Sequence, residues 1–180
     1  MRIVAGQYKG RQFNPGKNFS ARPTTDMAKE NLFNVLQNYI DFEAIKALDL
    51  FSGTGSISFE LASRGCQDIT SIEISYSNYQ FIKKTALQLG TIAIHPVKTN
   101  VFQFLKNNRE SFDFIFADPP YDHPQFEEVP AKVLEGKTLA PGSCFVLEHS
   151  KFYNFENFPE WIETRNYGSV HFSFFFRKEC

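Results

Sequence analysis

The sequence predicts an α/β fold with a doubly wound, Rossmann-like sheet, mostly parallel and closed by a C-terminal antiparallel hairpin. One observation is a series of short apolar segments, at residues 45–51, 69–74, 92–97, 112–117 and 143–147. Amphipathic segments lie between them, at residues 56–64, 76–89, 101–107 and 125–134. This alternation implies parallel strands joined by crossover helices. A two-residue turn, Gly168-Ser169, separates the last apolar segments, 164–167 and 170–176, and predicts the hairpin.

A smaller unit precedes this pattern. Residues 2–13 are expected to form a short hairpin, punctuated by glycines, and a polar loop follows over residues 14–20. The sequence RPTTD at residues 22–26 is typical of a helix start, with hydroxyl caps and an acid in the first turn. The helix is expected to bury one face, formed by Leu32, Phe33, Leu36, Tyr39 and Ile40. We therefore divide the chain into an N-terminal basic hairpin and helix extension, residues 1–40, and a main domain, residues 41–180.

Composition excludes several classes of protein. The 180 residues are 42% hydrophobic and 22% charged, which excludes a disordered chain, a collagen-like repeat and a coiled coil. No apolar run approaches the ~18 residues of a membrane span, and the N-terminus lacks a secretory signal. The cysteines, Cys66, Cys144 and Cys180, form no CxxC pair, which argues against a disulfide scaffold and a zinc site. These features predict a cytoplasmic protein without a bound metal, and nothing in the sequence demands more than a monomer.

Charge is distributed unevenly although the net charge is only −1. Residues 1–29 contain six basic side chains and one acidic side chain. This asymmetry has two interpretations, a basic arm that contacts a polyanion or an ordinary solvated surface. The basic residues are Arg2, Lys9, Arg11, Lys17, Arg22 and Lys29.

The segment DLFSGTG, residues 49–55, lies where the first parallel strand turns into its helix. Glycines at this turn let a ligand approach the backbone, and ligands of doubly wound sheets bind at this edge. Ser58 stands where a dinucleotide-binding fingerprint has its third glycine. Glu73, at the end of the second strand, is placed to accept the ribose hydroxyls of an adenosine. Asp49 would repel a pyrophosphate but attract a cation, which favours S-adenosylmethionine as the cofactor.

A second segment, DPPY, consists of Asp118, Pro119, Pro120 and Tyr121 and directly follows an apolar strand. Two prolines fix the backbone and remove two donors, leaving rigid carbonyl acceptors. The Asp118 carboxylate and the Pro119 carbonyl can accept the two hydrogens of an exocyclic amine while Tyr121 stacks on the base. Holding these hydrogens out of plane returns lone-pair density to the nitrogen and aims it at a methyl group. The segment therefore predicts methyl transfer to a base amine.

Together these segments resemble a known family, the bacterial 16S ribosomal RNA guanine-N2 methyltransferases of the small subunit (RsmD-like). The resemblance covers nearly the whole chain. DPPY is shared with adenine-N6 methyltransferases, whereas the N-terminal motifs are more specific to this family. The motifs that carry it are RIVAG at 2–6, KGR at 9–11, RPTTD at 22–26, ENLFN at 30–34, the glycine segment at 49–55 and DPPY at 118–121.

The resemblance implies three sets of site residues. The catalytic set is Asp118, Pro119, Pro120 and Tyr121. The cofactor-binding set is Asp49, Phe51, Ser52, Gly53, Gly55, Glu73, Ile74, Asn100 and Val101. The RNA-binding set is Arg2, Lys9, Arg11, Lys17 and Arg22. The implied partner is 16S ribosomal RNA, taken as free RNA or as the assembled 30S particle, with the target base flipped out of its stack.

Several alternatives stay open at this point. The chain could methylate the N6 amine of adenine in DNA or RNA, serve ribosome assembly without catalysis, or bind a nicotinamide cofactor. Asn100 stands where related enzymes often have an aspartate, so it either contacts the adenine or only caps a helix. His123 is a candidate for the base pocket, and Glu148 and His149 are expected in a surface loop rather than as a catalytic pair.

Overall fold

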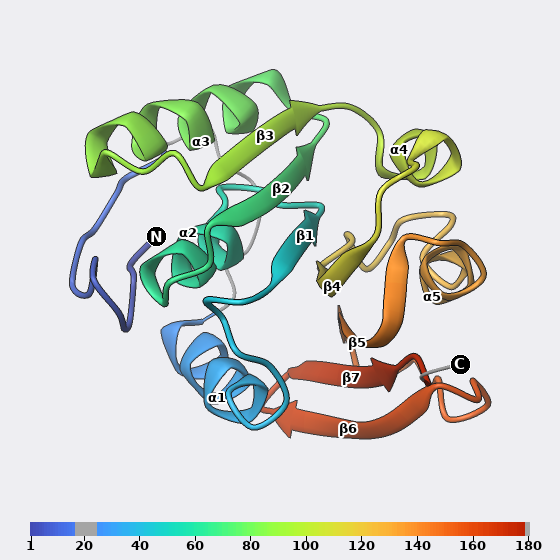
Figure 1. Ribbon diagram of the computed structural model, residues 1–180. Coiled ribbons are helices and arrows are strands. Elements are labelled where there is room, and N and C mark those ends of the chain that lie inside the picture. Colours follow the sequence, from blue (N-terminus) through green and yellow to red (C-terminus); the bar gives the residue numbers. More distant parts are fainter. Residues whose placement is uncertain (17–24, 179–180) are drawn as a thin grey trace.

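The computed structural model describes residues 1–16 and 25–178 and contains a mixed sheet of seven strands. The strand order is β3-β2-β1-β4-β5-β7-β6 (Figure 1). The strands are β1 (Lys46–Leu50), β2 (Asp68–Glu73), β3 (Ile94–Lys98), β4 (Phe112–Ala117), β5 (Leu139–His149), β6 (Trp161–Tyr167) and β7 (Val170–Phe176). β1 to β5 are parallel, and β7 and β6 continue the sheet in antiparallel pairs. This confirms the predicted fold class.

Five helices cover the two faces of the sheet in the described part of the chain. They are α1 (Asp26–Leu36), α2 (Ser56–Ser63), α3 (Tyr76–Leu89), α4 (Val101–Asn107) and α5 (Glu128–Leu134). Figure 1 shows α1, α2 and α3 on one face and α4 and α5 on the other. The crossover helices of a right-twisted parallel sheet are expected on both faces in this way.

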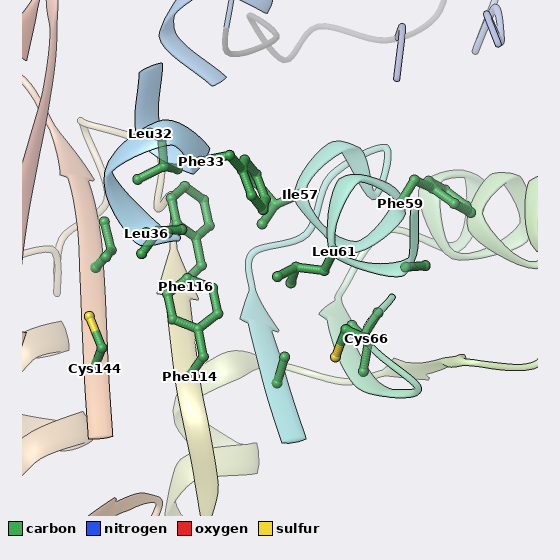
Figure 2. Close-up of a cluster of buried hydrophobic side chains, with 14 of the residues drawn as sticks. Leu32, Phe33, Leu36, Ile57, Phe59, Leu61, Cys66, Phe114, Phe116 and Cys144 are labelled. Carbon is green, nitrogen blue, oxygen red and sulfur yellow. The ribbon is translucent and has the colours of Figure 1, made fainter. Parts of the chain in front are cut away.

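Each face of the sheet has its own apolar core. Beneath α1, α2 and α3, Phe33 and Leu36 pack toward Phe114 and Phe116 of β4 (Figure 2). On the other face Phe145 of β5 belongs to a cluster with residues of α4 and α5. Side chains alternate between the faces along each strand, so both faces of the central strands are apolar. Residues that depart from this apolar pattern at the strand ends are therefore candidates for function.

The helix α1 begins as predicted but ends earlier. Thr25 caps it, and the Thr25 side chain accepts a hydrogen bond from the Ala28 amide. The helix ends at Leu36, and Tyr39 lies beyond it with 40% of its surface exposed, so the predicted buried face is too long. The Tyr39 ring instead packs against Phe176 at the end of β7, the strand next to the edge strand β6, with ring centroids 5.2 Å apart.

The predicted hairpin over residues 2–13 forms as a short antiparallel pair, with a bridge between Arg2 and Gln12 and backbone hydrogen bonds from the Ile3 amide to Arg11 and from the Gly10 amide to Ile3. The amides of Val4 and Ala5, which a strand would pair with its neighbour, donate instead to the carboxylate of Glu60 on α2. A buried side chain thus replaces the strand partner. The residues Lys17, Arg22 and Cys180, together with most of the predicted RPTTD helix start, lie outside the described residues.

Candidate functional site

The carboxyl ends of β1, β2 and β4 open into a cavity of about 540 Å³. Adjacent parallel strands place their C-terminal loops at one edge of the sheet, where doubly wound folds bind ligands. Eight predicted cofactor-binding residues line the cavity, namely Asp49, Phe51, Ser52, Gly53, Glu73, Ile74, Asn100 and Val101. Of the predicted catalytic set, Asp118 and Pro120 line it. The topology thus brings together residues that are far apart in the sequence.

The loop between β1 and α2 contains residues in the left-handed backbone conformation. Phe51 has φ +59°, and Gly53 has φ +54°. A Cβ on Gly53 would meet only the Phe51 carbonyl oxygen of the same loop, at 4.0 Å. The Ser52 hydroxyl bonds the carbonyls of Asp49 and Ile72, which ties the ends of β1 and β2 together. Left-handed backbone is costly for a residue with a side chain and is characteristic of binding loops.

Gly55 has a different place from the other predicted cofactor residues. It lies outside the cavity lining, with φ +77°. A Cβ on Gly55 would lie 2.9 Å from the Phe59 ring and 3.0 Å from Ile82. Only glycine therefore fits between α2 and α3 here, and the geometry gives this residue a packing role. The GxG spacing in the sequence pointed to Gly55, but this spacing does not distinguish a glycine that contacts a ligand from one that lets helices pack closely.

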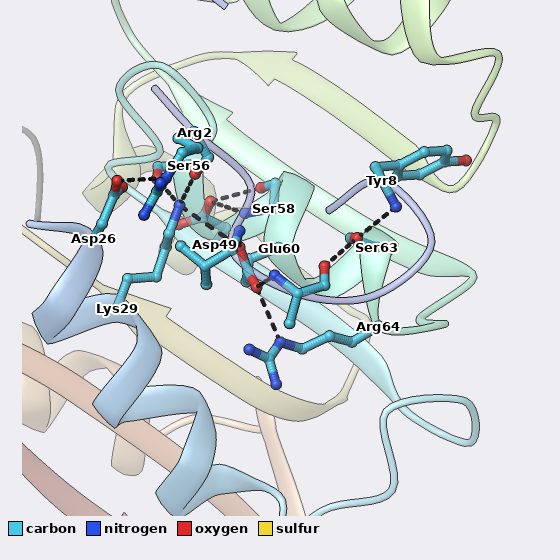
Figure 3. Close-up of polar contacts among 12 residues, drawn as sticks. Arg2, Tyr8, Asp26, Lys29, Asp49, Ser56, Ser58, Glu60, Ser63 and Arg64 are labelled. Atoms are coloured by element: carbon cyan, nitrogen blue, oxygen red, sulfur yellow. Dashed lines mark hydrogen bonds and ion pairs between the residues drawn. The ribbon is translucent and has the colours of Figure 1, made fainter. Parts of the chain in front are cut away.

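Asp49 is the most deeply buried acid of the cavity, with 1% of its surface exposed. Its Oδ2 accepts hydrogen bonds from the Ser58 hydroxyl (2.6 Å) and the Ser58 amide (3.1 Å), and Figure 3 shows these contacts at the base of α2. Burial raises the pKa of Asp49 to about 7, against the opposing effect of these bonds. The carboxyl is thus held at the boundary between its neutral and charged forms at physiological pH.

Glu73 ends β2 and is fixed at both oxygens. Oε2 accepts from the Gly53 amide (2.8 Å), and Oε1 accepts from the Ser75 amide (2.7 Å). The carboxylate thereby connects the glycine loop to the start of α3, while Glu73 still lines the cavity. Each carboxylate oxygen has more than one lone pair, so this arrangement leaves acceptor capacity for a ligand. Next to it Ile74 is 65% exposed and presents an apolar surface at the cavity rim.

Aromatic rings and a helix cap form the opposite wall. The Asn100 Oδ1 accepts from the amides of Phe102 and Gln103, which confirms its helix-capping role. His123, the candidate from the sequence, lines the cavity and stacks on Phe102 with a centroid distance of 5.4 Å. The His123 ring also meets the Phe51 ring edge-on at 6.0 Å. This wall suits a flat, largely apolar group.

The DPPY segment leaves β4 beside the cavity. The buried Pro119 follows Asp118, and Tyr121 is 39% exposed. The Tyr153 hydroxyl donates to the Tyr121 carbonyl (2.8 Å), which anchors the segment to the loop after β5. Burial raises the pKa of Asp118 well above its usual value, and the nearby charges of Glu148 and Asp49 raise it further. A positive charge bound beside Asp118 would lower this pKa again, because it favours the ionised form.

Glu148 and His149 correct the sequence interpretation. They were expected in a surface loop, but β5 extends through His149, and the two residues are 4% and 1% exposed. β5 keeps pairing with β7 up to His149 and His171, which buries this end of the strand. The Tyr121 hydroxyl donates to Glu148 at 3.4 Å. The sequence does contain a signal for Glu148, an acid at the end of an apolar segment, and this is the pattern that pointed to Glu73.

The N-terminal basic residues occupy different environments. Lys9 and Arg11 are exposed, whereas Arg2 forms an ion pair with Asp26 at 2.8 Å. Lys29, counted among the basic residues of the arm, is 1% exposed and pairs with the fully buried Glu60 at 3.6 Å (Figure 3). Burial lowers the pKa of Lys29 against the opposing effect of Glu60. Lys29 therefore joins α1 to α2 and contributes no surface charge.

The cavity combines several carboxylates with few compensating charges. Asp49, Glu73 and Asp118 all face it, and no lysine or arginine of the described residues lines it. A ligand with positive charge would relieve the repulsion among these acids. Within residues 1–16 and 25–178, no group of three or more His, Cys, Asp or Glu side chains could hold a metal ion. The helices of the described chain are all too short or too polar to cross a membrane.

Comparison with known proteins identifies the family of the chain. The family described as "Conserved hypothetical protein 95" matches residues 1–176. The chain is 32% identical over 155 residues to a protein from Haemophilus influenzae named "Ribosomal RNA small subunit methyltransferase D", covering 84% of this chain and 79% of that one. A protein of the same name from Buchnera aphidicola is 31% identical over 157 residues, covering 86% and 78%.

Solved structures show the same fold. The structure described as putative methyltransferase yhhF from Escherichia coli superposes with a TM-score of 0.85 at 27% identity, covering 100% of this chain and 99% of that one. A Thermus thermophilus 16S rRNA N2 G1207 methyltransferase, solved with AdoMet and guanosine, has a TM-score of 0.70 at 21% identity, covering 89% and 45%. The latter likeness concerns the fold alone.

Proposed function

The chain belongs to the family described as conserved hypothetical protein 95, with relatives named ribosomal RNA small subunit methyltransferase D, and from this premise we propose its reaction. It is a small-subunit rRNA methyltransferase that transfers a methyl group from S-adenosylmethionine to the exocyclic N2 amine of a guanine. The observation that carries the finer proposal is the juxtaposition of Asp118 with the acidic cavity at the ends of β1 and β2.

The cavity fits S-adenosylmethionine by charge and by shape. Asp49 and Asp118 face the space in which the sulfonium and amino groups of this cofactor would be stabilised. Glu73 would accept hydrogen bonds from the ribose, and the exposed surface of Ile74 would pack against the adenine. Phe51, Ser52, Gly53, Asn100 and Val101 complete the proposed binding set. Gly55 supports this set through packing. When bound, the cofactor supplies an electrophilic methyl group.

The DPPY segment would hold the nucleophile. The Asp118 carboxylate and the Pro119 carbonyl would accept the two amine hydrogens, and Pro120 fixes the turn that aims both acceptors. Tyr121, exposed at the rim, would stack on the target base. The amine would take the methyl group as the carbon–sulfur bond breaks, S-adenosylhomocysteine would be the leaving group, and the nitrogen would then lose its proton to solvent. The acceleration comes mainly from orientation.

RNA would be held by the N-terminal extension, residues 1–40. The exposed Lys9 and Arg11 are the proposed backbone contacts, with Arg2 as a third that must leave Asp26 to reach RNA. Lys17 and Arg22, which lie outside the described residues, complete the set. Contacts of this type position the enzyme and carry no sequence information. The target base would leave its stack to reach the cavity, because its amine is otherwise shielded.

The test is transfer of a labelled methyl group from S-adenosylmethionine to small ribosomal subunits lacking their guanine-N2 methylations. Protein-free rRNA and duplex DNA serve as parallel substrates. We expect label in the small-subunit RNA and none in DNA. Label in DNA alone would favour the adenine-N6 alternative, and no label in any substrate would favour a non-catalytic assembly role.

A further inference from the structure

The segment of residues 74–109 contains no acidic residue. It holds five basic side chains, although the whole chain has 20 acidic residues. The segment comprises α3, the edge strand β3 and α4. A helix that merely faces solvent usually carries charges of both signs. The one-sided charge therefore makes this edge of the molecule a candidate contact for a polyanion. The basic residues are Lys83, Lys84, Lys98, Lys106 and Arg109.

All five of these basic side chains are exposed. In the described part of the chain, none of them forms an ion pair with a carboxylate. By contrast, Arg2 pairs with Asp26, and Lys46 pairs with Asp68 and Glu110. Positive charges without a carboxylate partner are available to phosphate groups.

Two tyrosines of α3 lie beside two of these lysines. Tyr76, Tyr79 and Lys83 are three and four positions apart, so they follow one another along one face of the helix. The Lys83 Nζ lies 5.5 Å from the centre of the Tyr79 ring. The Nζ of Lys98, at the end of β3, lies 5.9 Å from the centre of the Tyr76 ring. We call these four residues the tyrosine–lysine stripe.

The tyrosine–lysine stripe begins at the rim of the cavity. Ile74 and Asn78, on either side of Tyr76 in the sequence, both line the cavity. Tyr76 itself is 63% exposed. From Tyr76 to Lys83 the helix rises by about 10 Å, the length of about three stacked nucleotides. Nucleotides bound along the stripe would therefore lead into the cavity.

The N-terminal extension lies on the same face of the sheet as the stripe. Phe13 stacks on Phe59 of α2 with ring centroids 6.5 Å apart, and α2 packs closely against α3 at Gly55. Figure 1 shows the N-terminal segment passing beside α3. The stripe thus continues the surface on which Lys9 and Arg11 are the proposed RNA contacts.

We propose that the tyrosine–lysine stripe binds single-stranded ribosomal RNA next to the methylated nucleotide. The tyrosine rings stack on bases, and the lysine ammonium groups contact phosphates, which is the combination that sequence-tolerant binding of single strands uses. The inference rests on the proposed function, because it takes ribosomal RNA as the partner. It adds a second RNA-binding surface to the N-terminal extension.

The test measures binding of protein-free small-subunit rRNA at several salt concentrations. Lys83→Gln with Lys98→Gln removes both charges of the stripe, and Tyr76→Ala removes its most exposed ring. The matched control, Lys106→Gln with Arg109→Gln, removes the same charge from the same acid-free segment. These two residues lie around the end of α4, just before β4 begins, and so at the opposite edge of the sheet from the cavity. Unchanged affinity for S-adenosylhomocysteine verifies that each variant is folded.

The lysines and the tyrosine should affect different quantities. Each lost phosphate contact should flatten the dependence of log Kd on log salt by about 0.7, so Lys83→Gln with Lys98→Gln should flatten it by about 1.4. Tyr76→Ala should weaken binding about fivefold or more with an unchanged salt slope, because stacking releases no counterions. The control should keep the wild-type slope. A wild-type slope in the lysine variant, an equal loss in the control, or no measurable rRNA binding by the wild type would overturn the proposal.

Methyl transfer separates this proposal from the one on which it rests. If the wild type methylates small-subunit RNA and the lysine variant keeps the wild-type KM for RNA, only the stripe is wrong. If the wild type methylates no RNA, the proposed function fails, and the salt dependence of rRNA binding still decides the role of the stripe. A loss confined to the assembled small subunit, with protein-free rRNA bound as before, would assign the stripe to a ribosomal protein and overturn the proposal.

Discussion

Neutralising Asp49 should stabilise the ligand-free protein, because this carboxyl is buried among other acids. The pKa of Asp49 rises from 3.8 to about 7 in the fold, so the native state holds a proton that the unfolded chain releases. Stability therefore falls as pH rises from the unfolded value and levels off above the folded one. Asp49→Asn removes this titration and keeps a side-chain oxygen for Ser58.

The size of the effect follows from the two pKa values of Asp49. At about 1.36 kcal/mol per unit, burial of the ionisable carboxyl costs about 2 kcal/mol near pH 5 and about 4 kcal/mol near pH 8. Asp49→Asn should recover these amounts. It should also weaken binding of S-adenosylmethionine, because the cofactor's positive charge favours the ionised acid. Wild-type affinity for the cofactor should accordingly rise as pH increases through about 7.

Urea denaturation of the wild type and Asp49→Asn at both pH values measures the difference directly. The gain in stability from Asp49→Asn should be larger by about 2 kcal/mol at the higher pH. Asp118→Asn is a comparison variant, since it removes a second acid of the cavity whose pKa is also raised and leaves the Ser58 contacts intact. A gain that is the same at both pH values, or a loss at both, would refute the assignment of a raised pKa to Asp49.

Three further predictions concern catalysis, RNA binding and the N-terminal extension. Asp118→Ala should reduce methyl transfer about a hundredfold or more with cofactor binding largely kept, and loss of cofactor binding in calorimetry would contradict its role. Lys9→Glu with Arg11→Glu should raise the KM for RNA and flatten its salt dependence by roughly one unit per lost phosphate contact, so an unchanged slope would remove these residues from the interface. Lys29→Met should lower the free energy of unfolding by about 3 kcal/mol, the lower end of the range for a broken buried ion pair, because Glu60 loses one cation and keeps only Arg64. A change within error in urea denaturation would argue against the pair of Lys29 and Glu60.

The parallel sheet could be predicted from the sequence because each strand is buried on both faces and reads as an apolar run. The run at residues 112–117 coincides with β4. The acids Asp49, Glu73 and Asp118 stood out because a charge at the end of such a run has no place in the core. Glycine spacing was less informative, since Gly53 faces the cavity while Gly55 serves packing between helices.

Features that depend on tertiary partners could not be predicted. Lys29 falls on a helix with a basic flank, and only the fold reveals that it meets Glu60, a residue thirty-one positions away, in the core. The same carboxylate accepts hydrogen bonds from the amides of Val4 and Ala5, so the backbone pairing of the predicted hairpin ends at Ile3. Glu148 was expected in a surface loop because the length of β5 depends on its pairing with β7, which the sequence alone does not show.

The most direct test of the central claim is the chemical identity of the methylated nucleoside. Small-subunit RNA would be treated with S-adenosylmethionine and either the wild type or Asp118→Ala, digested to nucleosides and separated by mass spectrometry. The account predicts N2-methylguanosine with the wild type and its loss with Asp118→Ala. Methylation of adenine, or undiminished N2-methylguanosine with Asp118→Ala, would contradict it.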